Sequence, residues 1–109
     1  ISAIAAGALP GKVGCSPDGK YAVVANEGEP NGDYSNDPEG SITVIDVSGG
    51  FDISVAATAD FKAFNAGGSK SLTGPVRVSA KAASVAQDLE PEFIAFSEDG
   101  STAFATLQE

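Results

Sequence analysis

Eight carboxylate residues are concentrated in two short stretches of this chain, and neither stretch contains a Lys or an Arg. The stretches are residues 27–40 and residues 84–92, and the chain has fifteen acidic residues in all. The eight candidate ligands are Glu27, Glu29, Asp33, Asp37, Glu39, Asp88, Glu90 and Glu92. Carboxylates that converge without basic partners repel each other, and a hard cation with oxygen ligands relieves that repulsion. The pattern predicts a metal site, provided that the fold brings the two stretches together.

Three interpretations of these acids stay open. In the first they bind Ca²⁺, which suits flexible loops better than Mg²⁺ because it accepts six to eight oxygen ligands in irregular geometry. In the second they are solvated loop residues. In the third some of them are catalytic carboxylates, but no sequence pattern identifies which ones. The favoured ligands lie at the ends of predicted strands, where the scaffold is rigid: Glu27, Glu29, Glu90 and Glu92. Asp33 and Asp37 lie nearer the tip of a long loop.

The elements that must position these acids are indicated by a hairpin that occurs twice. Residues 16–25 read SPDGKYAVVA and residues 97–106 read SEDGSTAFAT, which places the copies 81 positions apart. Each copy combines an Asp-Gly turn with an alternating strand, a pattern typical of β-hairpins. Asp18 and Asp99 are therefore predicted to form turns and not to bind ligands.

The strand pattern predicts an all-β fold. Strands are expected over residues 13–15, 21–26, 41–47 and roughly 55–64, and then again over 92–97 and 102–106. A short strand over residues 76–78 and a helix over 81–87 are further expectations. The order is a four-stranded antiparallel meander followed by the start of a second one, which is the form of β-propeller blades. Because a plain blade has only ~40–45 residues, either insertions or a degenerate blade must separate the copies, and the few strands between them favour insertions.

In a meander the turns alternate between the two ends of the strands. The first Asp-Gly turn therefore lies at one end, and the loop 27–40 and the segment 84–92 both lie at the other. This places the two acidic stretches on one face, near the central channel of a propeller. Cys15 is predicted to be a small buried residue of the inner strand. The aromatic residues of the hairpins are expected in the core between blades: Tyr21, Phe93, Phe96 and Phe104.

Several of these segments resemble known propeller repeats. SPDGKYAVVAN at residues 16–26 and SITVID at residues 41–46 are similar to YVTN and WD40-like repeats. With the stretches 26–30, 37–41 and 84–92 added, nearly the whole chain resembles the choice-of-anchor I family, whose members include proteins labelled alkaline phosphatase-like or mesenchyme-specific cell surface glycoprotein-like. The resemblance implies about one and a half blades of a seven-bladed propeller in a secreted or surface-anchored bacterial protein. Gly14-Cys15 departs from the bulkier or polar residues that relatives carry there.

The expected organisation is one propeller domain over residues 1–109, within a longer protein. One blade covers approximately residues 8–65, an insertion covers approximately 66–89, and the next blade starts at 90–109. The net charge of −9 excludes nucleic acid as a partner, because phosphate binding requires Lys and Arg. The chain has no His, one Cys and no run that could insert into a membrane.

These observations leave three functions to compare. The first is an extracellular, periplasmic or cell-surface propeller for binding or adhesion, stabilised by Ca²⁺, with the rest of the propeller and a surface ligand as partners. The second is a metal-dependent, alkaline phosphatase-like phosphoesterase, which needs a phosphate-binding cation such as Arg77 or Lys81. The third is a structural subunit whose strand edges pair with neighbouring subunits. Whether the protein is an enzyme stays undecided at this level.

Overall fold

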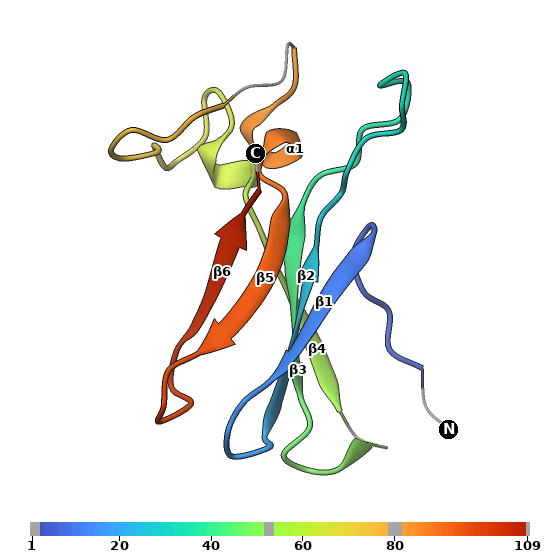
Figure 1. Cartoon of the computed structure of the whole chain (residues 1–109), viewed down its shortest axis with the longest axis vertical. Coiled ribbons are helices and arrows are strands. Elements are labelled where there is room, and N and C mark those ends of the chain that lie inside the picture. Colours follow the sequence, from blue (N-terminus) through green and yellow to red (C-terminus); the bar gives the residue numbers. More distant parts are fainter. Residues whose placement is uncertain (1–2, 52–53, 79–81, 109) are drawn as a thin grey trace.

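The computed structural model describes residues 3–51, 54–78 and 82–108, and its regular structure consists almost entirely of β-strands (Figure 1). The first sheet is a meander in the order β1-β2-β3-β4, and the second is the hairpin β5-β6. The strands of the two sheets are β1 (Pro10–Cys15), β2 (Tyr21–Asn26), β3 (Ser41–Asp46), β4 (Val55–Asp60), β5 (Pro91–Phe96) and β6 (Ala103–Leu107). The predicted all-β class and the four-stranded antiparallel meander are confirmed, and the arrangement is consistent with a propeller fragment.

The two hairpin turns have the same structure, as their sequences predict. In the first, the Ser16 hydroxyl donates to the Asp18 carboxylate over 2.6 Å and accepts from the Tyr21 amide. In the second, the Ser97 hydroxyl donates to the Asp99 carboxylate over 2.7 Å and accepts from the Thr102 amide. Each turn ends in a glycine with positive φ, which a side chain would strain. The aspartates therefore act as turn formers in both copies.

The buried core lies between the two sheets, where β5 packs against β1 and β2. Val23, Ala25 and Ile94 are its buried members. Ile42, Val44 and Phe96 pack around them, so that strands from both sheets contribute. The expectation that Phe96 lies in the core between the sheets is confirmed.

Several other core expectations are wrong for this chain. Cys15 is exposed, because strand alternation directs Gly14 toward β5 and Cys15 to the opposite face of the sheet. Tyr21, Phe93 and Phe104 are 40%, 51% and 61% exposed. Phe93 and Phe104 are exposed because strand alternation places them on the face of β5–β6 opposite Ile94, and it is Ile94 that packs in the core.

The connection between the sheets contains less regular structure than expected. Residues 76–78 form no strand, and the predicted last strand of the first sheet ends at Asp60, before a short 3₁₀ helix η2 (Lys62–Phe64). The predicted helix shortens to one turn, α1 (Val85–Asp88), and Lys81 lies outside the described residues. No helix in the described parts of the chain is long and apolar enough to cross a membrane.

Candidate functional site

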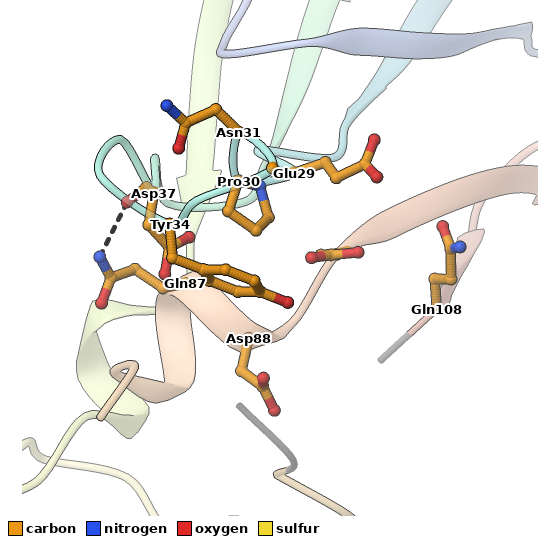
Figure 2. Close-up of a pocket in the computed structure, with 10 residues that line it drawn as sticks. Glu29, Pro30, Asn31, Tyr34, Asp37, Gln87, Asp88 and Gln108 are labelled. Carbon is orange, nitrogen blue, oxygen red and sulfur yellow. Dashed lines mark hydrogen bonds between the residues drawn. The ribbon is translucent and has the colours of Figure 1, made fainter. Parts of the chain in front are cut away.

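The two acidic stretches line one pocket at the end of the sheets opposite the Asp-Gly turns (Figure 2). The pocket measures about 320 Å³. One wall comes from the β2–β3 loop and the other from α1, the start of β5 and the end of β6. The lining residues, here called the acidic pocket, are Glu29, Pro30, Asn31, Gly32, Tyr34, Asp37, Gln87, Asp88, Glu90 and Gln108. The two stretches therefore meet where their positions in the strand order predicted.

Four of the eight candidate ligands line this pocket. Glu29 and Asp37 come from the loop, whereas Asp88 and Glu90 come from the segment that leads into β5. Asp88 is 3% exposed and Glu90 is 7% exposed, so both carboxyl groups lie on the buried wall of the pocket. No Lys or Arg belongs to the described lining residues.

The other four candidates lie outside the pocket lining. The Glu27 side chain lies against Gly11 of β1, at a place where any side chain on residue 11 would overlap its carboxylate. Asp33 accepts from the amide and hydroxyl of Ser35, and these bonds lower the pKa of the Asp33 carboxyl. Its turn is fully exposed.

Glu39 and Glu92 also lie outside the pocket, each in a different setting. The Glu39 carboxylate forms an ion pair with the Lys62 ammonium of η2 at 3.4 Å, a contact that no local sequence pattern indicates. Glu92 lies on β5 and is exposed. Two of the four favoured ligands, Glu29 and Glu90, are thus at the pocket, and Glu27 and Glu92 are not.

The loop that carries Glu29 and Asp37 is fixed at its neck and closed at its tip. At the neck, the Gly40 amide donates to the Ala86 carbonyl over 2.9 Å. At the tip, the Asn31 amide donates to the Asn36 carbonyl over 3.0 Å, and the Asn36 amide donates to the Asn31 side chain. Across the pocket, the side-chain amide of Gln87 donates a hydrogen bond to the backbone carbonyl of Asp37 over 2.8 Å (Figure 2).

The opposite wall begins with a capped turn of helix. The Ser84 hydroxyl accepts from the Gln87 amide, and the Gln87 side chain accepts from the Ser84 amide, which together form a capping box. The Ala86 amide donates to the Asn65 side chain over 2.8 Å, which fastens this turn to the connection after β4. The buried Leu89 then directs the chain into β5.

The sequence did not single out Tyr34, Asn31, Gln87 or Gln108 as pocket residues. Gln87 had a usable signal, because Ser-x-x-Gln is the spacing of a capping box. Gln108 is related to Glu27 by the 81-residue repeat, and both amides donate to the residue that precedes the first strand of their hairpin. Tyr34 has a positive φ of 58° at the loop tip, which no pattern around it predicts.

The donor set of the acidic pocket suits a hard cation, because carboxylate and amide oxygens are the ligands that Ca²⁺ prefers. Within the described residues, however, no group of three or more acidic or Cys side chains is placed closely enough to hold a metal ion. The lining thus offers oxygen atoms of the kind that Ca²⁺ binds, but the described side chains are not arranged as a metal site.

Comparison with known proteins gives one match. The model of the choice-of-anchor I domain matches residues 1–109. The chain belongs to the choice-of-anchor I family. Membership indicates that this choice-of-anchor I protein is a surface-associated bacterial protein. No curated protein and no solved structure matched the chain.

Proposed function

We propose that this choice-of-anchor I chain is part of an extracellular, surface-associated β-propeller whose acidic pocket binds Ca²⁺ and that serves adhesion or extracellular structure. One observation carries the proposal: four carboxylates from two distant segments line one pocket whose described lining includes no Lys or Arg. Family membership supports the location at the cell surface.

The chemistry of the lining favours Ca²⁺ over other common ions. The chain has no His, and its one Cys lies on β1 and not in the pocket lining, so a zinc site of the usual nitrogen or sulfur type is not supported. Mg²⁺ demands nearly ideal octahedral geometry, which a wall formed by an exposed loop does not supply. Glu29, Asp37, Asp88 and Glu90 would hold the ion.

Bound Ca²⁺ would act on the loop. In its absence, the Gln87–Asp37 hydrogen bond is a direct link between the loop and the opposite wall. An ion that takes oxygens from both walls adds a second link between them. The surface that the loop presents to a ligand is then fixed when Ca²⁺ is present.

The test is a Ca²⁺ titration of the chain, followed by melting temperature and by calorimetry, with Mg²⁺ and EGTA as controls. Extracellular Ca²⁺ modules have Kd values of roughly 10⁻⁴–10⁻³ M. Ca²⁺ at a free concentration of ~100 times its Kd stabilises the folded state by about 2.7 kcal/mol. We expect Glu29→Gln/Asp37→Asn to remove this gain and Asp33→Asn, in the same loop but outside the pocket lining, to keep it.

Three results would contradict the Ca²⁺ proposal. They are no thermal shift with Ca²⁺, an equal shift with Mg²⁺, and an equal loss in the Asp33→Asn control. Hydrolysis of p-nitrophenyl phosphate, measured in the same titration, addresses the phosphoesterase alternative. No observation favours that alternative, since Arg77 is not among the lining residues and Lys81 lies outside the described residues.

A further inference from the structure

Three places in the chain have an aspartate or asparagine followed directly by glycine. They are Asp18-Gly19, Asn31-Gly32 and Asp99-Gly100. At such a step the backbone nitrogen of the glycine can attack the side-chain carbonyl carbon that precedes it, because glycine has no Cβ to obstruct the approach. The three steps differ in how far the structure permits this attack.

The two Asp-Gly steps are held by hydrogen bonds of the hairpin turns. The Gly19 amide donates to the Ser16 carbonyl over 2.9 Å, and the Gly100 amide donates to the Ser97 carbonyl over 2.9 Å. The glycine nitrogens are therefore engaged. The side chains before them are carboxylates, whose negative charge repels a nucleophile and whose oxygen is a poor leaving group. The turns thus disfavour the attack.

The Gly32 amide, in contrast, is not engaged. Within the part of the chain that the structure describes, it donates no hydrogen bond. A Cβ atom built on Gly32 would meet no other atom within 4 Å, so the space around this nitrogen is open. Asn31 and Gly32 are both exposed, and hydroxide and water therefore reach them. The nucleophile of the Asn-Gly step is available for reaction.

The Asn31 side chain is held and polarised by two hydrogen bonds. Its Oδ1 accepts from the Asn36 backbone amide over 2.9 Å, and its Nδ2 donates to the Ser35 hydroxyl over 2.8 Å. A donor on the carbonyl oxygen withdraws electron density from Cγ and stabilises the negative charge that develops on that oxygen during an attack, as donors of an oxyanion hole do. The loop therefore activates the carbon atom that the Gly32 nitrogen would attack.

We propose that Asn31 is a site of spontaneous modification, at which the backbone nitrogen of Gly32 displaces ammonia from the side chain. The Gly32 nitrogen loses its proton to solvent base and forms a bond to Cγ of Asn31. The bond from Cγ to Nδ2 breaks, and Nδ2 takes up a proton and leaves as ammonia. The product is a succinimide ring. Water then opens the ring at either carbonyl, which gives aspartate or isoaspartate at position 31.

The reaction changes one wall of the acidic pocket in a single direction. Asn31 and Gly32 both line the pocket, and either product adds a negative charge to the loop. A carboxylate at position 31 cannot donate to the Ser35 hydroxyl, and isoaspartate adds a methylene group to the main chain. The pocket therefore differs between newly made and aged molecules. Ca²⁺ takes no part in the reaction, so the inference does not depend on the proposed function.

Peptide mapping by mass spectrometry tests the proposal. The folded chain is incubated at physiological temperature and mildly alkaline pH in heavy-oxygen water, with EGTA present so that Ca²⁺ does not affect the result. We expect position 31 to become a mixture of aspartate and isoaspartate that contains heavy oxygen. Asn36 and Asn65, which precede Asp37 and Ala66, should keep their amides because a Cβ atom obstructs the backbone nitrogen after them.

Gly32→Ala is the matched variant, because it changes the attacking residue and leaves Asn31 in place. The open space around Gly32 accommodates the methyl group, so the loop should keep its structure. The methyl group obstructs the attack, and conversion should slow by about tenfold or more, which corresponds to a barrier higher by about 1.4 kcal/mol.

Three results overturn the proposal. The first is an Asn31 that stays intact in the folded chain, whether or not it is converted after unfolding in urea, because the loop then protects the side chain. The second is a product that contains aspartate but no isoaspartate, since water then attacks the amide directly. The third is a rate of conversion that Gly32→Ala leaves unchanged.

Discussion

Gly40 holds the two walls of the acidic pocket together, and its replacement by alanine is the sharpest test of that geometry. It is buried where the β2–β3 loop meets the lead into β5. An alanine methyl group there would overlap the carbonyl oxygen of Leu89 and would lie 2.7 Å from the Pro91 ring. The nearest obstacle is backbone, which cannot rotate away, so the two segments must separate.

This overlap determines how much folding stability Gly40→Ala should lose. Overpacking of a well-packed site costs about 1–3 kcal/mol, and we place Gly40→Ala near ~3 kcal/mol because backbone on both segments must shift. For a domain of this size each kcal/mol lowers the melting temperature by roughly 4–8 °C. A loss of roughly 12–24 °C in the melting temperature is therefore expected for Gly40→Ala.

Gly32→Ala is the matched control, because Gly32 lies in the same loop with no atom within 4 Å of an added methyl group. A glycine replaced at a compatible position gains about 0.4–1 kcal/mol through the unfolded state. The assay is thermal and urea unfolding of both variants by circular dichroism. If Gly40→Ala melts at the temperature of the wild type, or if Gly32→Ala loses as much stability as Gly40→Ala, the neck of the loop is not closely packed.

Two smaller predictions concern the hairpin turn and the pocket wall. Hydrogen bonds from Ser101 and Ser97 lower the pKa of the Asp99 carboxyl from 3.8 to about 2. The ionised carboxylate therefore stabilises the folded state fully above pH ~4, and this stabilisation is lost as the pH falls toward 2. Urea midpoints between pH 5 and pH 2 should therefore fall less steeply for Asp99→Asn than for the wild type. Gln87→Ala should cost about 1–2 kcal/mol and increase hydrogen exchange in residues 29–37, because it removes the bond to Asp37 and half of the capping box. The control Ser84→Ala should destabilise α1 without changing hydrogen exchange in residues 29–37. If both variants increase hydrogen exchange there equally, the Gln87–Asp37 bond does not link the two walls of the pocket.

Local sequence patterns were sufficient to predict the hairpins and the meander. The alternation over residues 21–26 and the Asp-Gly turns are set by neighbouring residues, and β2 has the predicted bounds. Val76 and Val78 are β-branched, but residues 76–78 pair with none of the strands that the structure describes, so their propensity produces no strand. The one-turn α1 likewise depends on the Asn65 side chain, which is 21 positions away in the sequence.

The face that bears the acidic pocket was predictable, whereas the list of residues in it was only half predictable. Strand order decides at which end of the sheet a loop emerges. It therefore predicts that Glu29 and Glu90 lie at the same end, where both line the acidic pocket. It could not show that Glu39 pairs with Lys62 or that Glu27 lies over Gly11, because those contacts depend on how separate segments pack. Exposure of Cys15 follows from strand alternation once the register with β5 is known.

The closed neck of the β2–β3 loop has a consequence for how this protein can diversify. A side chain on Gly28 would lie 2.7 Å from the Glu39 backbone, so the two ends of the loop touch and the residues between them form an Ω-loop. The entropy of closing a loop rises slowly with its length, by only about 0.6 kcal/mol for each doubling. Residues 30–38 can therefore be lengthened or exchanged while both sheets keep their registers, which makes this segment a suitable place to graft a new binding sequence.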